Sequence, residues 1–114
     1  MTFKMRTAWG SSYDCFLEYD AENHHIQIYS IDPDDGFAEP FMTATATPAN
    51  GAIVPPGFVA IKNYSENAGI METLIGLRVI DKPIGRIPAG FTYLYLCRVH
   101  PRTIRKYGEP KESE

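Results

Sequence analysis

Histidines and cysteines are the side chains of this sequence best suited to nucleophilic or metal chemistry. His24 and His25 are adjacent, so on a strand they point to opposite faces and do not converge on one ion, which needs three or four ligands. Cys97 and His100 stand three residues apart, which also places them on opposite faces of a strand and prevents a Cys–His pair there. Cys15 could meet His100 only through a tertiary contact. These spacings predict no metal, no cofactor and no enzymatic activity.

A group of aspartates after residue 31 is the next candidate, because it resembles the start of a calcium-binding loop. An EF-hand loop needs glycine at its sixth position and glutamate at its twelfth. Counted from Asp32, Gly36 is fifth and Thr43 is twelfth, so the match fails. Proline presets one turn φ and an Asp-Gly pair tolerates a positive φ. The segment 32–36 therefore predicts an exposed turn rather than a metal site.

Charge is distributed unevenly along the 114 residues, whose net charge is −3 at pH 7. Residues 1–40 carry eight acids and two bases, a net of −6. Residues 41–81 carry a net of −1, and residues 82–114 carry seven bases and three acids, a net of +4. Such asymmetry bears on binding partners rather than on the fold. It also fits a solvated surface whose two ends attract each other after folding.

The acidic part of the chain favours a binding face for a basic protein. Carboxylates on strands and turns could imitate DNA phosphates and occupy a basic channel of a nucleic-acid enzyme. The candidate partner-binding residues are Asp14, Glu18, Asp20, Asp32, Asp34 and Asp35. A second copy of the chain is a further candidate partner, because an open sheet has unpaired edges.

The basic part of the chain provides the alternative, direct binding of nucleic acid. Backbone charge combined with an aromatic such as Tyr107 is how single strands are held. The candidate nucleic-acid contacts are Arg98, Arg102, Arg105 and Lys106. A sequence pI of about 5.6 is low for a dedicated nucleic-acid-binding protein. The acidic hypothesis is therefore preferred.

Alternating apolar and polar residues predict the strands that would carry these side chains. The expected strands cover residues 3–9, 13–19, 26–31, 41–47, 58–62 and 91–99. Apolar residues at 70, 71, 74 and 75 predict one helix over 66–75, with Ser65 as its N-cap and Gly69 inside it. Residues 84–90 are expected to form a loop, and the strand over 91–99, which has bulky residues on both faces, is expected to be central in the sheet. The order β-β-β-β-(β)-α-β predicts an α+β fold, a curved antiparallel sheet of four to six strands with one helix packed on a face.

Length and composition predict one domain. At 12.8 kDa and 44% hydrophobic residues, the chain can bury one modest core. We expect a single domain over 1–108 and a flexible charged tail over 109–114. No apolar run is long enough for a membrane span or a signal peptide, so the sequence predicts a cytoplasmic protein that does not bind membranes.

Three stretches resemble a domain-of-unknown-function family of short proteins from bacterial plasmids, conjugative elements and phages. They are an acidic-Pro-Phe strand at 39–41, a K-N-Y-S-E-N segment at 62–67 and a G-R-x-x-x-G-F segment at 85–91. The resemblance covers about residues 13–99, and the basic segment after Val99 departs from it. It implies no enzymatic activity and no functional residue. It implies an accessory protein of a mobile element, such as an anti-CRISPR or anti-restriction inhibitor that binds a host defence protein.

Overall fold

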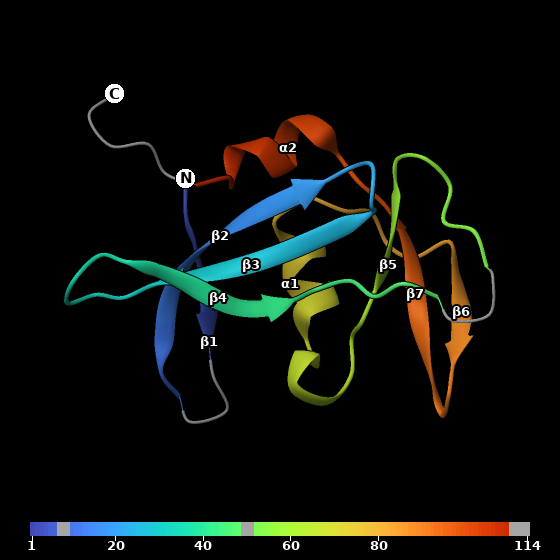
Figure 1. The fold of residues 1–114 in the computed structure, drawn as a ribbon, viewed down its shortest axis with the longest axis horizontal. Coiled ribbons are helices and arrows are strands. Elements are labelled where there is room, and N and C mark those ends of the chain that lie inside the picture. Colours follow the sequence, from blue (N-terminus) through green and yellow to red (C-terminus); the bar gives the residue numbers. More distant parts are fainter. Residues whose placement is uncertain (7–9, 49–51, 110–114) are drawn as a thin grey trace.

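The computed structural model describes residues 1–6, 10–48 and 52–109. Within these residues, seven strands form two antiparallel sheets that stand side by side (Figure 1). The strands are β1 (Phe3–Arg6), β2 (Ser12–Asp20), β3 (His25–Ile31), β4 (Ala38–Thr43), β5 (Phe58–Ile61), β6 (Gly85–Ala89) and β7 (Thr92–Arg98). The predicted α+β class and the antiparallel pairing are confirmed. Residues 7–9 of the first predicted strand lie outside the described residues.

The two sheets differ in how their strands follow the sequence. The first sheet has the order β1-β2-β3-β4, so each strand pairs with its neighbour in the chain. The second sheet has the order β5-β7-β6, so β7 is central. A central position was expected for this strand, because residues on both of its faces are bulky. Leu94 and Cys97, on opposite faces, are both buried.

A short segment after β4 joins the two sheets through backbone hydrogen bonds. The amide of Ala44 donates to the carbonyl of Ile26 in the first sheet, at 2.9 Å. The carbonyl of Ala44 accepts from the amide of Lys62, and the amide of Ala46 donates to the carbonyl of Ala60 in the second sheet. The predicted strand 41–47 therefore overlaps β4 only in part: β4 begins earlier, at Ala38, and ends at Thr43, and beyond it Thr45 forms an isolated bridge with Ile61 of the second sheet.

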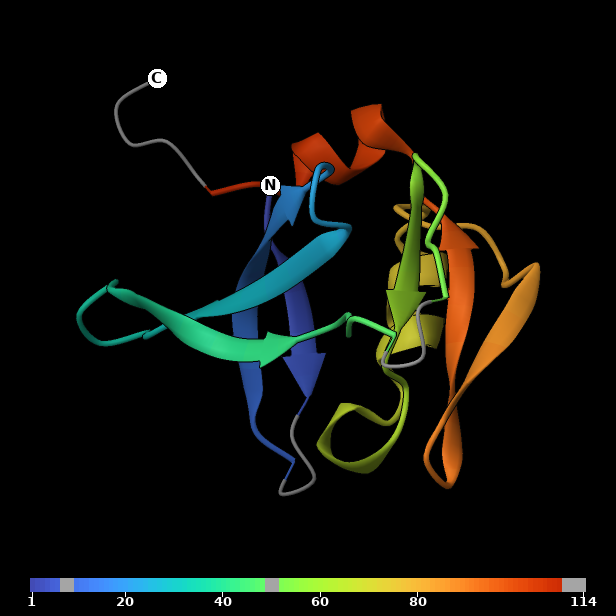
Figure 2. The ribbon, with the colours of Figure 1, turned by 45° about the vertical axis from the view of Figure 1, so that its right-hand side comes forward.

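Three short helical segments accompany the sheets: the 3₁₀ helix η1 (Ser65–Asn67), α1 (Ile70–Gly76) and α2 (Pro101–Lys106). Figure 2 shows α1 set behind the junction of the sheets and α2 lying across one end of the molecule. Ile70, Leu74 and Ile104 join strand residues in one buried cluster. Backbone contact also ties α2 to β2, because the amide of Leu17 donates to the carbonyl of Tyr107 at 2.6 Å.

The start of α1 differs from the predicted helix. Gly69, expected inside the helix, is its N-cap residue and has a φ of +94°, a conformation that favours glycine. Ser65 is not an N-cap: it is the first residue of η1, whose N-cap is Tyr64, and α1 begins five residues after it. The side-chain oxygen of Asn63 instead accepts from the amides of Gly69 and Met71, at 3.0 and 3.1 Å. The K-N-Y-S-E-N segment therefore serves to start this helix.

Two elements were not predicted, β6 and α2. Residues 84–90 were expected to be a loop because they contain proline and two glycines, yet β6 pairs with β7 along its whole length. A two-residue turn, Gly90-Phe91, joins them, and Gly90 takes the positive φ of +65° that the first position of a type II′ turn needs. Helix α2 is only six residues long and mostly polar, so its one buried residue, Ile104, leaves no stripe in the sequence.

The described residues include no helix long and apolar enough to cross a membrane. Residues 110–114 of the predicted tail lie outside the described part of the chain.

Candidate interaction surfaces

The turn between β3 and β4 carries an acidic surface at the end of a projecting hairpin (Figure 1). We call Asp34, Asp35, Phe37 and Glu39 the acidic tip; all four residues are exposed. Phe37 is 72% exposed, although its aromatic ring is large and apolar. Phe37 and Glu39 were not among the partner-binding residues predicted from the sequence. An apolar residue directly after a predicted acidic turn was the available signal.

Aspartate side chains hold this turn in place. The Asp32 carboxylate accepts from the Asp34 amide at 2.7 Å, and the Asp35 carboxylate accepts from the Phe37 amide at 2.8 Å. The Asp32 carbonyl also accepts from the amide of Gly36. The predicted turn at 32–36 is confirmed. Asp32 and Asp35 therefore shape the turn, while the side chain of Asp34 has no hydrogen bond or ion pair within the described residues.

The other three predicted acidic residues lie elsewhere on the first sheet. Asp14 forms an ion pair with Lys4 at 2.8 Å. Asp20 accepts from the side chain and amide of Asn23 in the β2–β3 turn, and these bonds hold the pKa of Asp20 below its ordinary value. Six residues of strand, about 20 Å, separate Asp14 from Asp20. Glu18 is exposed on β2 between them. The structure does not bring the six predicted acids onto one compact face.

The predicted nucleic-acid contacts lie at the opposite end of the chain. Arg102 and Lys106 are exposed and stand one turn apart on α2. The Arg105 side chain donates to the carbonyl of Pro101, and Arg98 is exposed at the end of β7. Tyr107, the aromatic expected to stack on bases, is instead partly buried.

Tyr107 packs edge-on against Phe3, with ring centroids 5.8 Å apart. This contact removes the stacking surface next to the basic residues. An exposed aromatic pair, Phe91 and Tyr93, does exist, with Arg86 over the Tyr93 ring at 4.2 Å. It lies at the other end of β7 from α2 (Figure 1), so these rings and the α2 cations do not form one surface.

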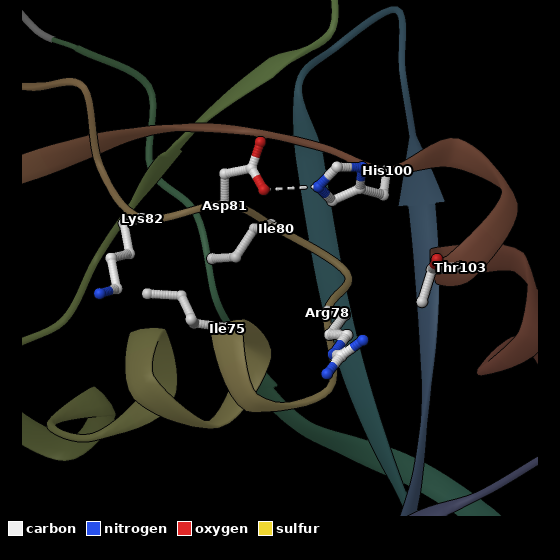
Figure 3. Close-up of a pocket in the computed structure, with 7 residues that line it drawn as sticks. All are labelled: Ile75, Arg78, Ile80, Asp81, Lys82, His100 and Thr103. Atoms are coloured by element: carbon white, nitrogen blue, oxygen red, sulfur yellow. Dashed lines mark hydrogen bonds and ion pairs between the residues drawn. The ribbon is translucent and has the colours of Figure 1, made fainter.

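A hollow of about 370 Å³ lies between the end of α1 and the start of α2. We call it the basic hollow; it is lined by Ile75, Arg78, Ile80, Asp81, Lys82, His100 and Thr103 (Figure 3). His100 and Asp81 are joined at 2.6 Å between Nε2 and Oδ1. This hollow could not be predicted from the sequence, because its residues come from separate segments.

The basic hollow has an apolar floor with a cation on each side. Figure 3 shows Ile75 between the side chains of Lys82 and Arg78, which extend in different directions. Both cations are exposed, and neither has a hydrogen-bond or ion-pair partner in the part of the chain that the structure describes. Asp81 is the one carboxylate of the hollow, and it is already paired with His100.

The cysteines and the paired histidines are the remaining side chains that could do nucleophilic or metal chemistry. Cys15 and Cys97 are both fully buried and are not joined by a disulfide. His24 and His25 are partly buried, and Nδ1 of His24 lies 3.0 Å from the carbonyl of Phe58. Over residues 1–6, 10–48 and 52–109, no group of three or more His, Cys, Asp or Glu side chains is arranged to hold a metal ion.

Comparisons of this chain with models of protein families, with curated proteins and with solved structures give no match. The resemblance to mobile-element proteins therefore rests on the sequence segments alone and stays a prediction.

Proposed function

We propose that this chain is a binding protein without catalytic activity, and that its acidic tip docks on a basic surface of a nucleic-acid-processing protein. The observation that carries the proposal is the construction of the tip. An exposed aromatic ring stands among carboxylates on a projecting turn whose backbone is held by side-chain hydrogen bonds. A preorganised turn loses little conformational entropy on binding, and buried aromatic anchors contribute strongly to affinity.

The acidic tip also reduces the number of predicted acidic residues that we propose to contact a partner directly. Asp34 has a side chain free to contact a partner, while Asp32 and Asp35 keep the turn in shape. Carboxylates steer a basic partner towards the tip, and Phe37 supplies apolar area once contact is made. The family resemblance adds the setting, inhibition of a host defence such as CRISPR or restriction. In that setting the tip would occupy a channel that normally holds DNA or RNA.

Capture experiments with single-residue variants test this function. The tagged protein is immobilised and exposed to a nuclease-treated bacterial lysate, and captured proteins are identified by mass spectrometry. Asp34→Lys and Phe37→Ala should each weaken capture of the partner by about tenfold or more. Glu22→Lys and Ile53→Ala change an exposed acid and an exposed apolar residue away from the tip, so they should capture normally.

The same experiment evaluates direct nucleic-acid binding, which the exposed Arg102 and Lys106 keep as the second candidate. In that case nuclease treatment would remove the captured material, and affinity would fall steeply with salt because counterions are released from phosphates. Arg102→Glu would then abolish capture, and Asp34→Lys would not. A partner that binds the two tip variants as tightly as the unaltered protein would refute the acidic-tip proposal.

A further inference from the structure

The basic hollow is suited to an acidic segment that also carries an apolar side chain. Its two cations flank the apolar floor formed by Ile75 and Ile80 rather than converging on one point (Figure 3). A single phosphate is held best where several donors converge on its oxygens. Cations spread around an apolar floor instead suit carboxylates spread around an apolar group.

The acidic tip of this chain is a segment of that kind. It presents the Phe37 ring with the carboxylates of Asp34, Asp35 and Glu39 around it, all exposed. The hollow, at about 370 Å³, has room for one aromatic side chain. Ring-to-floor contact would bury apolar area, and carboxylates would face Arg78 and Lys82. Tip and hollow therefore match in both charge and apolar content.

The tip and the hollow of one molecule lie in different parts of the fold. The β3–β4 hairpin projects away from α1 and α2 in both views (Figures 1 and 2), and the hollow is built from the ends of those helices. We propose that the acidic tip of one copy docks in the basic hollow of a second copy. This inference goes beyond the proposed function, because it adds Arg78 and Lys82 as a binding surface and shares only the tip.

Such a contact is heterologous, since it joins two different surfaces of identical chains. A pair as a whole keeps one unused tip, on one copy, and one unused hollow, on the other, so copies continue to add until a ring closes or an open chain forms. Pairing of sheet edges, by contrast, would join the same surface of both copies. This difference provides a decisive test.

Sedimentation equilibrium of the purified protein is the first measurement. At about 20 mM salt, the average mass should rise above the monomer value of 12.8 kDa as concentration increases. At about 500 mM salt the rise should be much smaller, because exposed charges are screened. A mass that stays at the monomer value at millimolar concentration and low salt would overturn the proposal.

Two complementary variants then locate the contact. Asp34→Lys alters the tip and leaves the hollow intact, whereas Arg78→Ala with Lys82→Ala removes the two positive charges of the hollow and leaves the tip intact. Each variant alone should self-associate about tenfold or more weakly. Mixed together, they should form a complex of exactly two chains, because one supplies the hollow and the other the tip, and growth stops there. Glu22→Lys and Arg102→Glu are the charge controls and should assemble normally.

The behaviour of the mixed variants shows whether the contact joins tip to hollow. If the mixed variants stay monomeric while the unaltered protein assembles, the contact is not tip-to-hollow and the proposal fails. Thermal unfolding of every variant checks that the fold is intact. The hollow variant should still capture the partner of the proposed function, so loss of self-association with retained capture identifies two separate properties of the tip.

Discussion

At the level of single residues, the two cysteines are chemically protected by their positions. Cys15 and Cys97 lie on the core faces of β2 and β7 with no exposed surface. Burial, reinforced by the negative charge of Asp14, raises the pKa of Cys15 to about 11. Burial, reinforced by Asp81, raises the pKa of Cys97 to about 12. Because the thiolate is the reactive form, both thiols are inert in the folded protein.

This protection predicts a loss of stability at high pH. Above the ordinary thiol pKa of 9.0, the unfolded chain releases protons that the folded chain retains. The cysteine contribution to the free energy of unfolding is therefore complete below pH 9 and declines as pH rises towards 11 to 12. Urea unfolding at several pH values should show a shallower decline for Cys97→Ala than for the unaltered protein. Equal slopes would contradict the assignment.

Only part of the candidate site could be predicted from the sequence. The acidic turn at 32–36 could be predicted because proline and Asp-Gly act locally. The position of Phe37 directly after this turn was a signal, but its exposure did not follow from it, since an apolar residue beside a strand is usually buried. The basic hollow depends on Ile75, Lys82 and His100 meeting in space, and no local pattern encodes that meeting.

At the level of elements, the side chain of Asn63 caps the start of α1, a role that was predicted for Ser65. Its side-chain oxygen accepts from two amides at the start of the helix, and its amide group donates to Glu72 at 3.3 Å. The apolar stripe correctly predicted the helix, because Ile70 and Leu74 are buried. Its first residue was misplaced, since the capping side chain comes from outside the usual position and Gly69 follows a 3₁₀ turn.

Replacing Asn63 tests this arrangement. We expect Asn63→Ala to lower the free energy of unfolding by about 1–2 kcal/mol, because helix amides lose their acceptor. Ser65→Ala is the matched control and should change stability by less than about 0.5 kcal/mol, because Ser65 is not an N-cap. Denaturant unfolding followed by circular dichroism measures both. A larger effect at Ser65 than at Asn63 would show that the cap is misassigned.

At the level of the whole molecule, the fold class followed from the sequence but the division into two sheets did not. Alternation located six strands, and the bulky faces of 91–99 correctly indicated a central strand. Nothing in the segment 41–47 reveals that Ala44 bonds to Ile26 on one side and Lys62 on the other. Long-range packing decides where a strand passes from one sheet to the other. The alternation of apolar and polar residues along a segment carries no information about such packing.

The order β5-β7-β6 also has a consequence for the time course of folding. Paired residues of β2 and β3 are close in sequence, from Asp20 with His25 to Asp14 with Ile31. Paired residues of β5 and β7 are far apart, as in Phe58 with Arg98. Closing a longer loop costs more chain entropy, and this cost arises before the contacts that offset it have formed. The β6–β7 hairpin is local, so we expect the first sheet to be complete before β5 pairs with β7 and completes the second sheet.

Pulse-labelled hydrogen exchange during refolding can follow this order strand by strand. Amides of β2 and β3 should become protected earlier than those of β5, and simultaneous protection would contradict the expectation. During that interval the core face of the first sheet, with Leu17 and Ile28, would have no complete second sheet to cover it. The non-sequential strand order thus makes the nascent first sheet the stage of folding most exposed to aggregation.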